Sequence, residues 1–372
     1  MGAGIAAAVL AASGLALVLA PPSAATLGPS PSQFESGDGN MILNTDGNTD
    51  WNCFNSSAVL STTTGLSCNS AVTGVTFGPP TGSSPAVNFP APNAYTGNDP
   101  SWVPGQKMDQ GTCIPGTDSK SPAKDTFTDV ASYNETAVSG GALGDTYLYG
   151  ATERVAANGS ASENIELSKT AGQNAPSGAC TNSPVIYRTA GDKLIALNYI
   201  SGGSTLAPPQ ILTWVTSSSG LTDSTGTYAG SCVVSSDQVP CWSSTVETMP
   251  AGTFEGRTNP APIPAGQNGI GGDALAIAQF AEFGINLSTV GVIPTGSCSA
   301  FAQETWEARS SGSSFTSNPS DIEVETHQVS NCGNVTVIKH TDPRTSSQQF
   351  SYTSSGLLDN SKAGGTCSGI AS

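Results

Sequence analysis

The stretch Thr146-Tyr-Leu-Tyr-Gly-Ala-Thr-Glu-Arg-Val155 decides the fold, because its side chains alternate with a period of two residues. Successive side chains of an extended strand point to opposite faces of a sheet, so this period predicts a β-strand. Other stretches share the period, and many are bounded by Gly, Ser, Asn or Pro. They are Thr126–Tyr133, Asn164–Ser168, Leu194–Ile200, Ile211–Val215 and Ser297–Ala308.

Short, closely spaced strands predict an all-β protein, a large β-sandwich of jelly-roll or concanavalin-like type. One helix is expected in it, from Asp273 to Gly284. Asp273 can cap its start, and four apolar residues would share one face: Ala274, Ile277, Phe280 and Ala281. Residues Gly74 to Gly105 are dominated by Pro, Gly, Ser and Asn and predict a long loop.

The first 25 residues predict a secretory signal peptide. Ile5 to Ala20 is an uncharged, mostly apolar run, and Pro21-Pro22 and small residues follow it as far as Ala25. A membrane anchor is the alternative, but the run is short for one. We therefore expect a secreted or cell-surface protein.

Composition excludes some partners. Only 11% of residues are charged, and the net charge is -16 with no basic stripe. Nucleic acid needs such a stripe, and an acidic surface repels anionic lipid, so neither is an expected partner beyond membrane passage during export. We expect a monomer without a cofactor, with a host or cell-wall protein or glycan as its ligand.

The nine cysteines indicate disulfides in an oxidising compartment. Zinc is disfavoured because there is no Cys-x-x-Cys and the two histidines are not spaced as a ligand pair. Connectivity stays open, and Cys367 has no obvious partner. The candidate pairs are Cys53/Cys68, Cys113/Cys180, Cys232/Cys241 and Cys298/Cys332.

A domain boundary is expected near Asn331, so that the head domain covers residues 26–333 and an incomplete domain covers 334–372. Val335-Thr-Val-Ile-Lys-His-Thr-Asp-Pro343, followed by Phe350-Ser-Tyr352, resembles the first strands of prealbumin-like (Cna-B or pilin-type) domains. Three upstream segments resemble the head that precedes such stalks in actinobacterial, Gram-positive surface proteins. They are Phe34–Asn40, Tyr147–Arg154 and Phe283–Leu287.

This resemblance implies a role for Lys339. Pilin-type domains use a lysine at this strand position to attack an Asn side chain, which forms an intramolecular isopeptide bond. Lys339 shares one strand face with Val335 and Val337. The later strands that would supply the Asn and an acid are absent from the sequence, and a lysine that only extends its amine to solvent is the alternative.

A second candidate is the strand Asp321-Ile-Glu-Val-Glu-Thr-His327, which places Asp321, Glu323 and Glu325 on one face. Alternating carboxylates resemble the catalytic strand of some jelly-roll β-glucanases, whose retaining chemistry needs carboxyl groups roughly 5–5.5 Å apart. Outward-facing polar residues give the same pattern, so catalysis is the second interpretation here.

Two weaker binding candidates remain. Glu304 and Trp306 share a strand face, which fits a sugar-binding pair or an ordinary half-buried strand. Asp38, Asp46 and Asp50 lie among Gly and Asn and offer oxygen ligands for calcium, although their spacing matches no EF-hand and also fits turns.

These observations predict a surface-displayed structural or adhesive protein of the cell wall with no catalytic activity. The alternative is a secreted carbohydrate-active enzyme, a glucanase-like glycoside hydrolase, or a lectin on the same sandwich.

Overall fold

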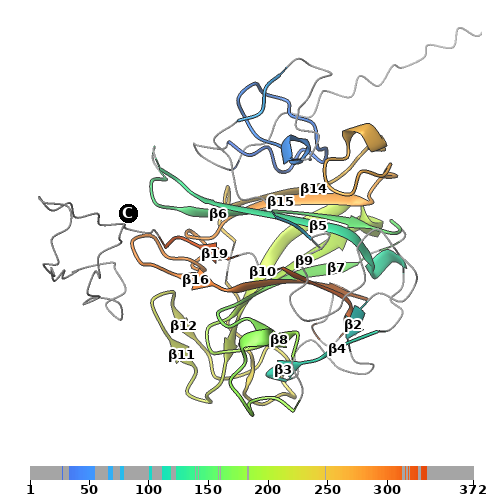
Figure 1. Cartoon of the computed structure of the whole chain (residues 1–372). Coiled ribbons are helices and arrows are strands. Elements are labelled where there is room, and N and C mark those ends of the chain that lie inside the picture. The colour runs from blue at the N-terminus through green and yellow to red at the C-terminus, as the bar shows by residue number, and fades with distance from the viewer. Residues whose placement is uncertain are drawn as a thin grey trace, which may run out of the picture.

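The computed structural model is a sandwich of two antiparallel β-sheets (Figure 1). It describes residues 27, 33–54, 66–69, 76–78, 100–102, 111–118, 123–138, 140, 142–157, 159, 161–181, 184–247, 249–311, 315, 317, 319–325 and 328–332. The predicted signal peptide and the predicted prealbumin-like segment, 334–372, lie outside these residues. The all-β prediction is confirmed.

The smaller sheet has five strands, which contain the stretch 146–155 at their centre. In spatial order they are β1 (Thr76–Gly78), β5 (Phe127–Thr136), β6 (Thr146–Arg154), β15 (Phe280–Asn286) and β14 (Phe254–Thr258).

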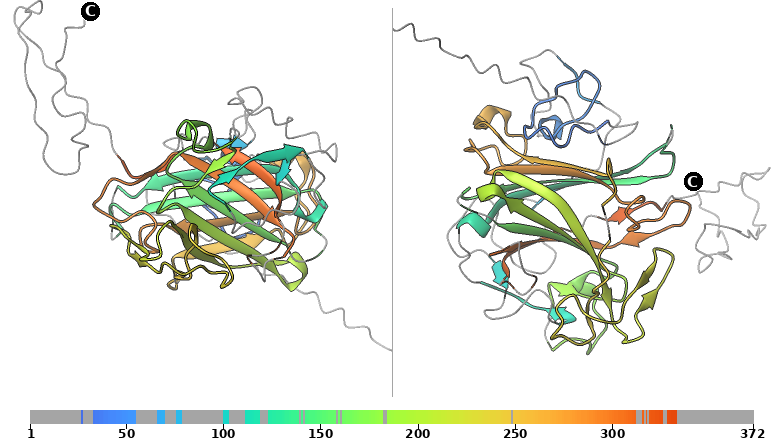
Figure 2. Two further views of the ribbon diagram at one scale, coloured as in Figure 1. Left: turned by 90° about the horizontal axis from the view of Figure 1, so that it is seen from below. Right: turned by 180° about the vertical axis from the view of Figure 1, so that it is seen from behind.

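The larger sheet has eight strands, seen side by side from below in the left view of Figure 2. In spatial order they are β13 (Cys241–Trp242), β10 (Thr205–Val215), β9 (Lys193–Ile200), β7 (Ser162–Ser168), β17 (Gln303–Arg309), β18 (Pro319–Glu325), β2 (Pro100–Trp102) and β4 (Gly116–Asp118).

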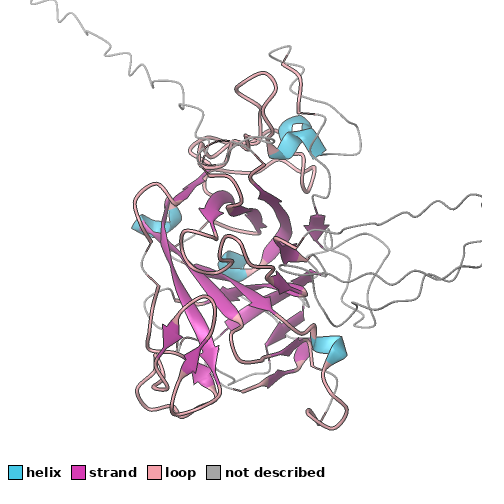
Figure 3. Cartoon of the chain, turned by 90° about the vertical axis from the view of Figure 1, so that its left-hand side faces the viewer, coloured by secondary structure: helices cyan, strands magenta, loops and turns pink. Residues whose placement is uncertain are grey.

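Three two-stranded sheets complete the strands: β11 (Leu221–Thr222) with β12 (Thr227–Tyr228), β16 (Ala300–Phe301) with β19 (Val329–Ser330), and β3 (Cys113–Ile114) with β8 (Ile186–Tyr187). The helical elements of the described chain are short 3₁₀ turns at the ends of strands and in loops (Figure 3). They are η1 (Trp51–Phe54), η2 (Ala123–Asp125), η3 (Gly172–Asn174), η4 (Ser201–Gly203) and η5 (Ala265–Gln267).

The core lies between the sheets, and the strand period explains it. Leu148, Phe283 and Ile285 point inward from the five-stranded sheet and meet Ile165 and Trp306 from the eight-stranded sheet. Residues that alternate with these point to the outer faces, where loops cover them. Burial of this apolar area is the main source of stability.

The helix expected from Asp273 to Gly284 is wrong. Residues 273–279 contain an isolated β-bridge at Leu275 and a turn at Ile277, which is exposed, and the strand β15 begins at Phe280. Ala278 has φ of 61°, which a helix cannot contain. The apolar spacing also fits period two, because Ala281, Phe283 and Ile285 share the inner face, and pairing with β6 and β14 selects the strand.

The long loop expected at Gly74–Gly105 is wrong in part. It contains β1, which pairs with β5, and β2, which joins β18 to β4. Both strands are three residues long and lie near a sheet edge or at the edge itself. Strands this short contain too few residues to show a clear alternation in the sequence. The expected strand 297–308 also divides, at Ala302, into β16 and β17.

Residues 33–54, here called the N-terminal segment, cover the outer face of the five-stranded sheet (Figure 1, blue). Phe34 stacks on Tyr149 with ring centroids 4.6 Å apart, and Trp51 meets the edge of Phe34 at 4.7 Å. Ala131 and Phe280 belong to the same buried cluster. The segment is therefore packed as part of the domain.

Candidate metal centre

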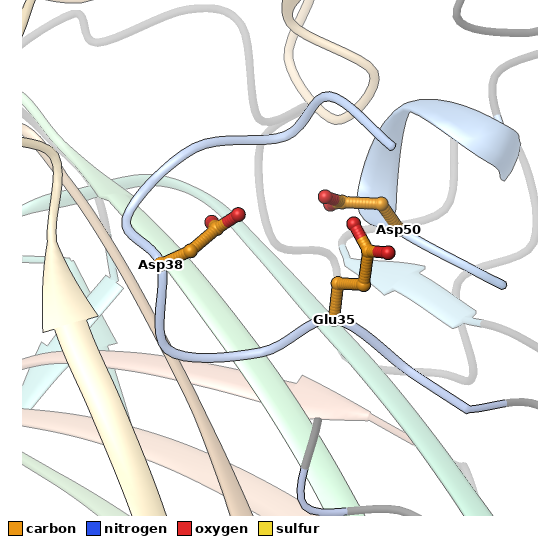
Figure 4. A group of neighbouring side chains, drawn as sticks. All are labelled: Glu35, Asp38 and Asp50. Carbon is orange, nitrogen blue, oxygen red and sulfur yellow. The ribbon is translucent and has the colours of Figure 1, made fainter. Parts of the chain in front are cut away.

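Three carboxylates of the N-terminal segment meet above the five-stranded sheet. A parallel bridge between Phe34 and Thr49 places the neighbouring residues Glu35 and Asp50 side by side, and Glu35 N donates to Thr49 O at 2.8 Å. Asp38 approaches from the intervening turn, and the three side chains point toward one another (Figure 4). One oxygen of each lies within 4.8 Å of the others.

A fourth carboxylate lies beneath them. Glu282 projects from β15, and Gly37 N and Gly39 N donate to its Oε1 at 3.1 and 2.7 Å. The Trp51 indole donates to Oε2 at 3.1 Å. Asp38 lies close enough to Glu282 for the two carboxylate charges to repel each other.

Burial and mutual repulsion shape the ionisation of this cluster. Burial raises the pKa of Asp38 to about 6. Burial, and then repulsion from Glu282, raise the pKa of Asp50 well above its usual value. Burial and the charge of Asp38 act in the same way on the pKa of Glu282. Asp38, Asp50 and Glu282 thus resist ionisation unless positive charge accompanies them.

The carboxylates of the cluster accept different numbers of hydrogen bonds. Glu35 accepts from Asn44 N at 2.6 Å, and from Thr45 N and Asn48 Nδ2 at 2.9 Å each. In contrast, Asp50 Oδ1 accepts from the adjacent Trp51 N, and Asp50 Oδ2 is buried and has no hydrogen-bond partner among the described residues. A buried acceptor without a donor is costly, so it calls for a ligand.

The turn Ser36-Gly-Asp-Gly39 depends on its glycines. Gly39 has φ of 77°, and a Cβ there would lie 2.6 Å from Thr258 O. Only glycine accepts both the left-handed backbone and this close approach. The turn therefore presses onto β14 and directs amide groups at Glu282.

Asp38, Asp46 and Asp50 were the calcium candidates, and the structure brings two of them together. Asp46 is exposed and accepts from Ser67 N at 2.8 Å, outside the cluster. Glu35 and Glu282 were missed. Glu35 precedes the Ser-Gly-Asp-Gly turn, which offered a local signal, whereas Gly39 and Glu282 are 243 residues apart.

Glu304 and Trp306 share one face of β17, as expected, but it is the face inside the sandwich. Both are 0% exposed. Glu304 accepts a 2.7 Å hydrogen bond from Ser132 Oγ of the opposite sheet, and the Trp306 ring lies 5.9 Å from that of Phe283. This burial does not fit a sugar-binding surface, which needs groups that a ligand can reach from solvent.

The strand predicted at Asp321 forms as part of β18, but Asp321 faces the inside of the sandwich. A solvated or catalytic strand would present its carboxylates to solvent. The register of β18 pairs Glu323 with Trp306, so Asp321 and Glu323 share the face that points toward the other sheet. Asp321 is buried and accepts from Phe127 N at 2.7 Å. The expectation of outward-facing carboxylates is wrong for Asp321, and the side chain of Glu325 lies outside the described residues.

A different carboxylate pair occupies the outer face of the eight-stranded sheet. Glu166 and Glu307 are buried neighbours there, and burial, then repulsion from Glu166, raise the pKa of Glu307 well above its usual value. Arg188 donates to Glu166 through Nε at 2.9 Å and Nη2 at 2.8 Å, and its guanidinium lies 5.0 and 5.1 Å from the ring centroids of Trp214 and Trp242. The sequence analysis did not select this pair, because its members are far apart in the chain.

The isopeptide candidate Lys339 lies outside the described residues. The eight cysteines predicted to pair form four disulfides: Cys53–Cys68, Cys113–Cys180, Cys232–Cys241 and Cys298–Cys332. These are the pairs considered from the sequence, and they indicate folding in an oxidising compartment. Among the described residues, no helix is long and apolar enough to span a membrane.

Comparison with known proteins adds no relative: no family model, no curated protein and no solved structure matches this chain.

Proposed function

We propose that this chain is an exported protein displayed at a cell surface, where its sandwich head has a structural or adhesive role. The four disulfides carry the proposal. Disulfides that close loops and sheet edges persist in an oxidising environment such as the outside of the cell. Only 11% of the residues are charged, a composition that is common among extracellular β-proteins. The resemblance of residues 335–352 to prealbumin-like repeats supports a Gram-positive cell wall as the setting.

Surface display and ligand capture test this function together. The full reading frame is produced in a Gram-positive host, and an antibody against residues 33–332 is applied to intact cells. The purified chain is then measured against immobilised collagen, fibrinogen and cell-wall glycans. Labelling of intact cells and saturable binding to one of these surfaces are expected. Protein confined to the cytoplasm with reduced cysteines contradicts the proposal.

A carbohydrate-active enzyme or lectin is the second candidate, and the pair Glu166 and Glu307 favours it. Two neighbouring carboxyls on one sheet face are the groups that glycoside hydrolysis uses, and Arg188, the partner of Glu166, lies over the Trp214 ring. Their complete burial and the Arg188 ion pair rank this function second. Release of reducing ends from a soluble β-glucan by wild type, lost in Glu307→Gln, would displace the adhesive proposal.

A further inference from the structure

We propose that Glu35, Asp38 and Asp50, with Glu282 beneath them, form a Ca²⁺ site that fixes the N-terminal segment to the five-stranded sheet. The distances fit this ion. Ca²⁺ binds oxygen at about 2.3–2.6 Å, so ligands on opposite sides of it lie roughly 5 Å apart. The nearest oxygens of Glu35, Asp38 and Asp50 lie within 4.8 Å of one another.

A separate observation points to a ligand at this position. Asp50 is 0% exposed, its Oδ2 has no hydrogen-bond partner, and its carboxylate faces the other two (Figure 4). A cation would satisfy this oxygen directly. Thr45 N and Asn48 Nδ2 both donate to Glu35 Oε1, whereas Glu35 Oε2 accepts from Asn44 N and keeps one lone pair for a cation.

The charge balance requires a cation for the ionised cluster. Within the described chain the ion pairs are Lys124–Asp125 and Arg188–Glu166, and neither includes a member of the cluster. Arg257 pairs with Glu282 in the β14–β15 register, but its side chain is exposed. A buried group of carboxylates without a basic partner either keeps protons or binds a metal ion.

The donor set selects Ca²⁺ among common metal ions. All four side chains offer hard carboxylate oxygens, which zinc and copper sites seldom use alone. Mg²⁺ requires a near-octahedral shell and retains water, whereas Ca²⁺ accepts irregular shells that include bidentate carboxylates. The ion would hold Glu35, Asp38 and Asp50 together across a turn-rich segment whose Gly37 and Gly39 amides donate to Glu282 of β15, so binding would hold residues 33–54 in place.

Terbium luminescence tests the site directly. Tb³⁺ replaces Ca²⁺ and emits when a nearby indole is excited, and Trp51 donates to Glu282. The full chain is stripped with EDTA, dialysed and titrated with Tb³⁺ at pH 7.5. We expect emission that Ca²⁺ abolishes and that an equal concentration of Mg²⁺ leaves largely intact. Trp51→Phe should dim the emission while Ca²⁺ still raises the melting temperature.

Matched variants locate the ion. Asp50→Asn and Glu35→Gln should weaken Tb³⁺ binding at least about 10-fold, since each removes a charged ligand. Asp46→Asn is the control, because Asp46 lies in the same segment, is exposed and stands outside the cluster. Absent emission, emission that survives Asp50→Asn, or equal loss in Asp46→Asn overturns the proposal, and equal displacement by Mg²⁺ overturns the choice of Ca²⁺.

Thermal melting separates a metal ligand from a merely structural carboxylate. At 1 mM Ca²⁺ the wild type should melt at least about 4 °C higher than in EDTA, because an ion that binds only the folded state stabilises it. In EDTA, Asp50→Asn should melt no lower than wild type, since it removes repulsion, and should gain nothing from Ca²⁺. A variant that melts lower in EDTA, beside a wild type indifferent to Ca²⁺, contradicts the site.

Discussion

Gly150, in the middle of β6, shows how tightly single residues are set in this core. A Cβ on Gly150 would lie 2.3 Å from Phe283 Cζ and 2.6 Å from Trp306 Cη2. Both rings are buried, and neither is the free end of a flexible chain. The glycine therefore makes room for the aromatic contact between the two sheets.

We expect Gly150→Ala to lower the free energy of unfolding by about 1–3 kcal/mol, because the rings must shift in a close-packed interior. Urea unfolding followed by tryptophan fluorescence measures it. Gly266→Ala is the control, since nothing lies within 4 Å of a Cβ at that position and its backbone is not in the left-handed region. Equal stability of the Gly150 variant and wild type would show that the core is loosely packed there.

The ion pair of Arg188 with Glu166 is fully buried, and Glu307 adjoins it. Burial and then repulsion from Glu166 raise the pKa of Glu307, whereas Glu166 forms the ion pair with Arg188. A broken pair would leave one charge without a partner in the interior.

Arg188→Met should therefore cost about 3–5 kcal/mol, whereas the double variant Arg188→Met with Glu166→Leu should recover most of that loss. Chemical unfolding of wild type, both single variants and the double variant gives the coupling. Strict additivity of the two single losses would show that the two groups do not stabilise each other.

Among the elements, the disulfides differ in the length of chain that they close. Cys113–Cys180 joins β3 to the loop after η3 with a separation of 67 residues, whereas Cys232 and Cys241 are 9 apart. The entropy that a cross-link removes from the unfolded chain increases with loop length.

The double change Cys113→Ser with Cys180→Ser should cost about 4 kcal/mol, and Cys232→Ser with Cys241→Ser about 2.5 kcal/mol. Differential scanning calorimetry of the two variants under one condition measures the order. A larger loss from the short loop would show that native contacts around Cys232, rather than chain entropy, dominate its contribution.

For the whole molecule, buried carboxyls couple stability to pH. Asp129 on β5 and Glu153 on β6 are directly paired neighbours that share a hydrogen bond. Burial, and then repulsion from Glu153, raise the pKa of Asp129 from 3.8 to about 8. Burial raises the pKa of Glu153 from 4.5 to about 7.

Because the folded protein holds protons that the unfolded chain releases above pH about 4, the free energy of unfolding should fall as pH rises to about 8. The stabilisation is complete below the unfolded pKa values and is lost through the folded ones. Urea unfolding in EDTA at pH 5, 6.5 and 8 measures this slope, and Asp129→Asn should flatten it. An increase in stability from pH 5 to 8 in wild type would contradict the raised pKa values.

The sequence alone was enough to predict the β class, the position of most long strands and the oxidising compartment. Period-two alternation is a local property of the sequence, so it predicts four of the long strands directly: β5, β6, β7 and β9. The number of cysteines and the scarcity of charged residues are properties of the composition, so they do not depend on which strands become neighbours.

Only the tertiary structure decided what the faces and distant residues do. The stretch from Phe280 to Gly284 fits both helical and strand periods, and pairing with β6 and β14 selected the strand. Glu304 faces the interior because a second sheet lies over it. Glu282 meets Asp38 and Asp50 because the N-terminal segment folds across β15. Contacts between remote segments arise from packing, which local periodicity does not encode.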